Sequence, residues 1–360
     1  MLSLTTYASR LNDVLNSIAS MFTVPEKTKA KTSFADLPEK ISFHDSMIAL
    51  YGVPLDITTS FGKGTKRGPE AIRISSARQI ETLIFEENTD ISELGMVYDL
   101  GDLKMPYSGR LASRPSAKHI VNHTRNETRA KKRNIEPSVM SFLNRSIPEI
   151  TRTLYYDARK MPFLLGGEHT LSYYSIKALA NEKPMILHFD AHRDMKEEYD
   201  NKKMCHTTPF FHLISEGHID GKDLIQIGIR QSDNQENITA RKSGVTTLDA
   251  WAIHDNLEPL LLHLNNLTNS RKIYISFDID VYDLPYVPCT GTPEPFGLSP
   301  FEVIRFLKSI HKTAKLIGMD MVEVSAKAAD FREGTLATHT IYRILVQDFA
   351  RNNRNTFRRN

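Results

Sequence analysis

The chain has 360 residues and a net charge of +3; 40% of its residues are hydrophobic and two are cysteine. This length allows one large α/β domain or two smaller ones, and the hydrophobic share is enough for a sizeable core. Two cysteines argue against a disulfide-stapled secreted domain and favour a reducing cytoplasm, and so small a charge gives general nucleic-acid binding no support. No apolar run approaches about 18 residues, so we expect no membrane partner.

The first 43 residues are predicted to form an N-terminal extension made of a helix and a linker. Apolar residues from Leu4 to Ile18 recur at helical spacing, without the continuous apolar segment of a secretory signal. Residues 25–43 are polar and contain several lysines, which is typical of a linker. We therefore expect a single domain over residues 44–360.

Eight short apolar runs follow, most of them separated by segments that can form helices. Strands that alternate with helices predict a largely parallel sheet covered on both faces. The runs span residues 46–51, 95–100, 163–165, 185–187, 224–229, 245–248, 273–277 and 314–319. We also expect a long helix over about residues 137–159, and ligands at the carboxyl ends of the strands.

A basic insertion at about residues 105–135 interrupts this alternation. Between Arg110 and Arg133 the chain has eight Lys or Arg and one acidic residue. No aromatic residues are interleaved with these charges, so a solvated insertion or a subunit contact is favoured over an RNA-binding or anion-binding loop.

The most informative run is His188–Asp194, which directly follows an apolar strand. If the strand continues, Asp190, His192 and Asp194 share one face, and Arg193 points away. Three charged or titratable groups at a buried strand end repel or desolvate one another unless a cation compensates them. The run therefore predicts a metal site.

Three further clusters also follow apolar strands. The first is Gly166–His169, where the glycines allow a tight turn and His169 is either a ligand or a structural histidine. The second is Ser276–Asp280, with carboxylates two residues apart, and the third contains Asp320 and Glu323, each of which also fits a capping or ion-pair role.

Together these clusters supply two imidazoles and four carboxylates. The candidate ligands are His169, Asp190, His192, Asp194, Asp278 and Asp280. This set would hold two divalent ions if some carboxylates bridge, and an oxygen-rich set without thiolate favours Mn²⁺ over a structural Zn²⁺. Two such ions lower the pKa of a bridging water and make it a nucleophile near neutral pH.

Six motifs in order resemble the ureohydrolase superfamily, which contains the arginases and agmatinases. Its Gly-Gly-Asp-His, Asp-Ala-His-x-Asp and Ser-x-Asp-Ile-Asp motifs correspond to the clusters above, with Glu168 in place of the aspartate. The other matching segments are Gly52–Asp56, Gly68–Arg73 and Gly291–Glu294. Within the superfamily the chain is most similar to the agmatinases of archaeal type.

The resemblance implies a three-layer α/β/α fold with an eight-stranded, mostly parallel sheet and two Mn²⁺ per subunit. By motif position, one ion would be held by His169, Asp190, Asp194 and Asp278, and the other by Asp190, His192, Asp278 and Asp280. It also implies that His206 shuttles a proton to the leaving amine, that Glu323 receives the guanidinium, and that Asp194 holds the bridging hydroxide. A homotrimer or homohexamer is implied as well.

The segment Met195–Met204 lacks the Asn- and Ser-rich pattern with which arginases bind their amino acid. The favoured reaction is therefore hydrolysis of agmatine to putrescine and urea, a step of polyamine biosynthesis. Aminopropylagmatine, guanidinobutyrate and arginine remain alternatives, because Thr207, Cys289 and Phe296 replace family glycines near the substrate mouth.

Two readings outside this scheme also stay open. The chain could be a catalytically weak family member kept as a regulatory or assembly subunit, although its ligand set is intact. Cys205 and Cys289 flank the site and could have a redox or metal role, although small apolar packing residues are the simpler interpretation.

Overall fold

In the computed structural model, residues 4–36, 41–94, 96–106, 125–326 and 331–353 are described. A nine-stranded sheet runs through these residues in the order β1-β5-β2-β6-β11-β10-β7-β8-β9. Its strands are β1 Phe22–Thr23, β2 Ile48–Gly52, β5 Val97–Leu103, β6 Met161–Leu165, β7 Met185–Phe189, β8 Leu224–Ile227, β9 Thr246–Leu248, β10 Lys272–Asp278 and β11 Lys315–Val322. All of these pairings are parallel except that of β1 with β5. A separate hairpin pairs β3 (Leu83–Ile84) with β4 (Thr89–Asp90).

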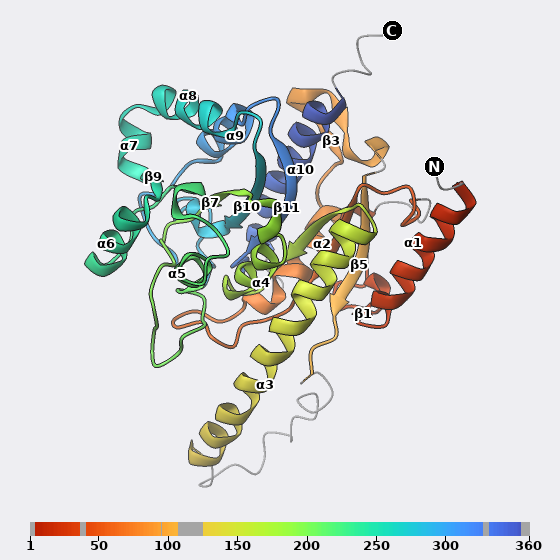
Figure 1. The fold of residues 1–360 in the computed structure, drawn as a ribbon, viewed down its shortest axis with the longest axis horizontal. Coiled ribbons are helices and arrows are strands. Elements are labelled where there is room, and N and C mark those ends of the chain that lie inside the picture. The colour runs from red at the N-terminus through yellow and green to blue at the C-terminus, as the bar shows by residue number, and fades with distance from the viewer. Residues whose placement is uncertain (1–3, 37–40, 95, 107–124, 327–330, 354–360) are drawn as a thin grey trace.

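Helices cover both faces of the sheet (Figure 1). They are α1 Leu4–Ala19, α2 Gly68–Arg78, α3 Arg125–Arg152, α4 Thr170–Ala178, α5 Pro209–Ser215, α6 Asn234–Ser243, α7 Ala250–Asp255, α8 Leu257–Thr268, α9 Pro300–Ser309 and α10 Arg332–Asn353. One core cluster joins the sheet to α2, α7, α8, α9 and α10, and the other joins it to α1, α3, α4 and α5. The predicted three-layer α/β/α fold is thus confirmed.

Strand alternation explains how one sheet supplies two cores. On β2, Ile48 and Leu50 belong to the first core cluster, whereas Ala49 and Tyr51 belong to the second. Every residue of β2 is buried, so the strand reads as a continuous apolar run and not as a polar-apolar alternation. This is why all eight predicted strands are present, with ends that differ from the prediction by at most three residues.

The ninth strand, β1, lies in the N-terminal segment and was not predicted. It has only two residues and pairs antiparallel with β5 through Phe22 and Leu103. Beyond it, Phe34 is fully buried in the first core cluster. A two-residue strand has no periodicity to read, so the sequence offered no signal for it. The division of the chain at residue 43 remains a prediction.

Helix α3 starts at Arg125, whereas the sequence predicted a start near residue 137. α3 continues through Pro137 and Pro148, although proline inside a helix removes a backbone donor. Its first turns extend past the other elements (Figure 1). Residues 125–135 of the basic insertion are therefore helical, and most of the remaining insertion lies outside the described residues.

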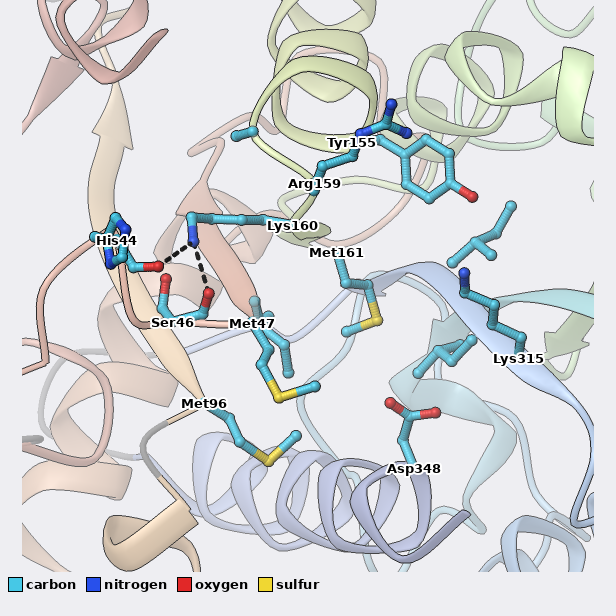
Figure 2. Close-up of a pocket in the computed structure, with 14 residues that line it drawn as sticks. His44, Ser46, Met47, Met96, Tyr155, Arg159, Lys160, Met161, Lys315 and Asp348 are labelled. Atoms are coloured by element: carbon cyan, nitrogen blue, oxygen red, sulfur yellow. Dashed lines mark hydrogen bonds between the residues drawn. The ribbon is translucent and has the colours of Figure 1, made fainter. Parts of the chain in front are cut away.

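A cavity of about 320 Å³ lies where β2, β6 and β11 begin, at the edge of the sheet opposite to their carboxyl ends (Figure 2). Lys160 Nζ donates to the backbone oxygens of His44, at 3.3 Å, and Ser46, at 2.6 Å. Burial lowers the pKa of Lys160 to about 8. These bonds tie the loop before β2 to the start of β6, which is a structural role.

Candidate metal centre

Four neighbouring strands, β6, β11, β10 and β7, end at the same edge of the sheet. His169 follows β6, Asp190 follows β7, Asp278 ends β10, and Glu323 follows β11. Parallel strands bring their carboxyl ends together, so residues separated by more than 150 positions in the chain meet at one place.

The predicted ligand atoms converge there. His169 Nδ1 lies 3.0 Å from Asp190 Oδ2, 2.9 Å from Asp194 Oδ2 and 3.2 Å from Asp278 Oδ2. His192 Nδ1 lies 3.0 Å from Asp280 Oδ2 and 3.4 Å from Asp190 Oδ1. The two carboxylate oxygens of Asp190 therefore face different imidazoles. All six residues that the sequence selected are brought together.

Charge in this cluster is poorly compensated by the protein itself. Burial, and then the neighbouring Asp280 and Asp190, raise the pKa of Asp278 well above its usual value. Burial, and then Asp190, raise the pKa of Asp194 to about 7. Apart from the contacts above, His169 Nδ1 and Asp280 Oδ2 have no hydrogen-bond partner among the described residues. Orphaned lone pairs among buried carboxylates fit a divalent metal, which would replace the missing positive charge.

The predicted strand geometry of the run from His188 to Asp194 is wrong, although its side chains do converge. β7 ends at Phe189, and only His192 makes a further isolated bridge, to Gln231. Asp194 adopts a left-handed backbone with φ of 51°, which turns its carboxylate back toward His169. Aspartate tolerates this conformation better than most residues, and sequence spacing does not reveal it.

A hydrogen-bonded chain behind His169 fixes the orientation of its ring. Ser276 Oγ lies 3.1 Å from His169 Nε2 and donates to Asp320 Oδ1 at 2.9 Å, while the Tyr274 hydroxyl donates to Asp320 Oδ2 at 2.8 Å. Because the serine proton is directed to Asp320, the oxygen accepts from Nε2–H, and Nδ1 is left to face the carboxylates. Ser276 and Tyr274 were missed, although they alternate with Asp278 on β10.

Glu323 presents a free carboxylate oxygen next to this cluster. Its Oε1 accepts from the backbone N–H of His169 at 2.8 Å, and its buried Oε2 has no partner among the described residues. The backbone at Glu323 is left-handed, with φ of 58°. A Cβ added at Gly291 would lie 2.8 Å from Oε2, so a larger residue at that position would displace the Glu323 carboxylate.

His206 lies beside a loop that was not assigned to the site. Its Nε2 is 3.0 Å from Ser60 Oγ, its backbone N–H donates to Thr58 Oγ1 at 3.2 Å, and its buried Nδ1 has no partner among the described residues. Burial lowers the pKa of His206 to about 4, so the ring is neutral at physiological pH. Glu168 anchors the loop by accepting from the Thr58 backbone N–H at 2.8 Å.

Arg230, which was also missed, joins two loops of the site. Its guanidinium donates to the backbone oxygens of Asp280, at 2.7 Å, and Glu294, at 2.9 Å. Glu294 Oε1 in turn lies 3.7 Å from His192 Nε2. Near this loop, Phe296 has φ of 64°, the left-handed conformation that the family glycine would favour, and its ring lies against Trp251.

A cavity of about 240 Å³ opens beside His192 and Asp194. Lys196 on its wall pairs with Glu236 at 3.1 Å and also with Asp233. Outside the ligand set, this wall therefore carries one positive and two negative charges, and its single cation is already neutralised. This cavity is therefore weakly acidic.

The fold and the cluster define an α/β protein with a buried imidazole and carboxylate centre at the carboxyl edge of its sheet. The Arginase family model matches residues 46–346, and the chain belongs to this family. The predicted membership of the ureohydrolase superfamily and the predicted hydrolase class are thereby confirmed. None of the helices among the described residues combines the length and apolar character that a membrane span requires.

Three relatives illustrate the match. An agmatinase of Pyrococcus horikoshii is 30% identical over 79% of this chain and 86% of its own length. An N(1)-aminopropylagmatine ureohydrolase of Thermus thermophilus is 29% identical over 82% of this chain and 88% of its own length. A mitochondrial guanidino acid hydrolase of Homo sapiens is 31% identical over 81% of this chain and 75% of its own length.

Solved structures show the same architecture. The proclavaminate amidino hydrolase from Streptomyces clavuligerus superimposes with a TM-score of 0.71 at 26% identity, covering 89% of this chain and 97% of its own. The agmatine ureohydrolase of Thermoplasma volcanium superimposes with a TM-score of 0.72, covering 95% of this chain and 99% of its own. At 21% identity, the second likeness supports the fold alone.

Proposed function

We propose that this protein is a binuclear manganese ureohydrolase that converts agmatine to putrescine and urea. The observation that carries the proposal is the position of Asp190, whose two oxygens face His169 and His192 in a pocket with three further carboxylates. One carboxylate between two imidazoles is the arrangement expected of a ligand that bridges two ions.

The donor set divides naturally between two ions. One would be held by His169, Asp190, Asp194 and Asp278, whose atoms meet at His169 Nδ1. The other would be held by Asp190, His192, Asp278 and Asp280. Oxygen-rich ligands with imidazole and without thiolate suit Mn²⁺. When bound, such a pair makes water a nucleophile near neutral pH.

The remaining groups bind the substrate and move protons. The free Oε2 of Glu323 accepts from the guanidinium and orients its carbon toward the metal centre. The carboxylate of Asp194 accepts a hydrogen bond from the attacking water and holds it in line. His206 starts neutral, takes up a proton through its unpartnered Nδ1, and delivers it to the leaving amine.

The weakly acidic cavity beside His192 and Asp194 supports a substrate with a cationic tail. Because Lys196 is already paired with Asp233 and Glu236, no free cation on this wall awaits a substrate carboxylate. Agmatine and aminopropylagmatine end in amines, whereas guanidinobutyrate and arginine carry a carboxylate. The names of the Pyrococcus and Thermus relatives agree with this preference, and that of the human relative represents the guanidino acid alternative.

Urea release in the presence of Mn²⁺, measured over agmatine, aminopropylagmatine, guanidinobutyrate and arginine, tests the proposal. We expect kcat/KM to be highest for one of the two amines, with agmatine first. Arginine as the best substrate would overturn the assignment. Two Mn²⁺ per chain without urea from any compound would instead support a regulatory or assembly subunit.

The other predictions from the sequence extend this proposal. We propose a cytoplasmic homotrimer or homohexamer that binds a small guanidino molecule and has no nucleic-acid partner. Light scattering of the purified protein measures the assembly, and a salt titration of RNA binding tests the basic insertion.

A further inference from the structure

Arg193 lies within the ligand run, but its side chain is directed away from the metal centre, as predicted. Its Nη1 donates to Gln226 Oε1 at 2.7 Å and to Thr247 Oγ1 at 2.9 Å, and its Nε donates to Asn237 Oδ1 at 2.8 Å. The guanidinium thus contacts β8, β9 and α6, three elements that supply no candidate ligand.

The contact with Arg193 fixes which way the Gln226 amide points. A guanidinium can only donate, so the amide oxygen must face it, and the amide nitrogen must point the other way. That nitrogen lies 2.8 Å from the backbone oxygen of Arg193 and 3.2 Å from His188 Nδ1. Gln226 and His188 are register partners on β8 and β7, and both are fully buried.

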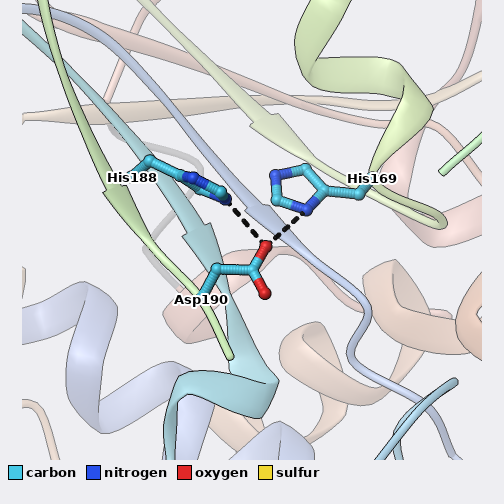
Figure 3. Close-up of side chains that lie close together, drawn as sticks. All are labelled: His169, His188 and Asp190. Atoms are coloured by element: carbon cyan, nitrogen blue, oxygen red, sulfur yellow. Dashed lines mark hydrogen bonds and ion pairs between the residues drawn. The ribbon is translucent and has the colours of Figure 1, made fainter. Parts of the chain in front are cut away.

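The amide in turn determines the tautomer of His188. Because the amide nitrogen of Gln226 donates, His188 Nδ1 must accept, and the proton of the neutral ring resides on Nε2. His188 Nε2 lies 2.7 Å from Asp190 Oδ2, the oxygen that also faces His169 (Figure 3). Asp190 therefore receives a hydrogen bond from behind while a lone pair of the same oxygen is left for a metal.

We propose that Arg193, Gln226 and His188 form a relay that orients Asp190, and that His188 is a positioning residue and not a metal ligand. The inference rests on the proposed metal centre. Distance alone would instead suggest that His188 is a ligand, because His169, His188 and Asp190 have ligand atoms close enough together to hold one ion. The proton on Nε2 excludes that role, because the ring has no free lone pair toward Asp190.

Binding of Mn²⁺ to the metal-free protein tests the relay without any assay of activity. His188→Phe keeps a ring and removes the donor, whereas His188→Gln places an amide N–H near the former Nε2. We expect His188→Phe to weaken Mn²⁺ binding about 10- to 100-fold, as loss of a group behind a ligand does elsewhere, and His188→Gln to stay within about threefold of the wild type. Equal affinity for the wild type and His188→Phe would overturn the relay.

A spectroscopic measurement covers the case in which His188→Phe fails to fold. Imidazole ¹⁵N spectra of the wild type, metal-free and loaded with diamagnetic Cd²⁺, report which nitrogen carries the proton. We expect Nε2 of His188 to be protonated in both states. Loss of the Nε2 proton on Cd²⁺ binding would identify His188 as a ligand. Neither measurement depends on urea release, so failure of the relay and failure of the proposed activity are distinguishable.

Discussion

At the scale of single residues, the site combines ligands that the sequence revealed with partners that it concealed. All six ligand positions follow apolar strands, and all except His169 are spaced two residues apart, a regularity that can be read directly. The groups behind them, such as Ser276, Gln226 and Arg230, are ordinary polar residues whose role depends on register between strands. Only the structure shows that Ser276 faces Asp320, or that Arg230 joins two loops.

Glu323→Gln tests guanidinium binding. The amide keeps the shape of the side chain and removes the charge on the free Oε2, so we expect kcat/KM to fall about 100-fold, as when a buried charged pair loses one partner. Mn²⁺ affinity should be unchanged, because Glu323 is not among the ligands. The same substitution at the exposed Glu258 is the matched control and should leave kcat/KM at the wild-type value.

His206→Asn gives a prediction for pH. Burial lowers the folded-state pKa of His206 from 6.5 to about 4, so between these values the unfolded chain binds more protons. The stability that a neutral His206 provides is therefore complete above pH 6.5 and is lost as the pH falls toward 4.

The measurement is urea unfolding of the metal-free wild type and of His206→Asn near pH 7 and near pH 5. The difference in unfolding free energy between the two proteins should shrink by about 2 kcal/mol at the lower pH. A difference that is constant with pH would mean that the pKa of His206 is the same in the folded and the unfolded protein.

At the scale of elements, the sequence located strands well and the ends of helices poorly. Most of the parallel strands, such as β2, β7 and β8, are apolar and buried on both faces, and such runs stand out in the sequence. β1 was missed because a two-residue strand has no period, and the first turns of α3 were missed because they lie in the basic insertion. Their formation is decided by tertiary pairing and not by local sequence.

Gly101→Ala tests the pairing of β1 with β5. Gly101 has φ of 87°, and an added Cβ would lie 1.9 Å from the backbone oxygen of Thr23. Gly217, with φ of 74° and no atom within 4 Å of an added Cβ, provides a control with comparable backbone strain alone. We expect unfolding free energies to fall by about 2–4 kcal/mol for Gly101→Ala and about 1 kcal/mol for Gly217→Ala. Equal losses in chemical denaturation would show that β1 adds no stability.

At the scale of the whole molecule, a strongly apolar sheet carries a cluster of carboxylates at one edge. The core clusters on the two faces offset the cost of burying the charge that folding alone leaves uncompensated around Asp278 and Asp194. The family resemblance predicted this arrangement as a whole. The acidity of the cavity beside His192 and Asp194 depends on the pairing of Lys196 with acids about 40 positions away, and no motif encodes it.

Crystals of the protein grown with Mn²⁺ test the central claim most directly, through anomalous difference maps recorded on either side of the manganese edge. The account predicts two manganese peaks per chain, one next to His169 Nδ1 and one next to His192 Nδ1, with Asp190 and Asp278 contacting both. A single peak, or a peak bound by His188, would contradict it.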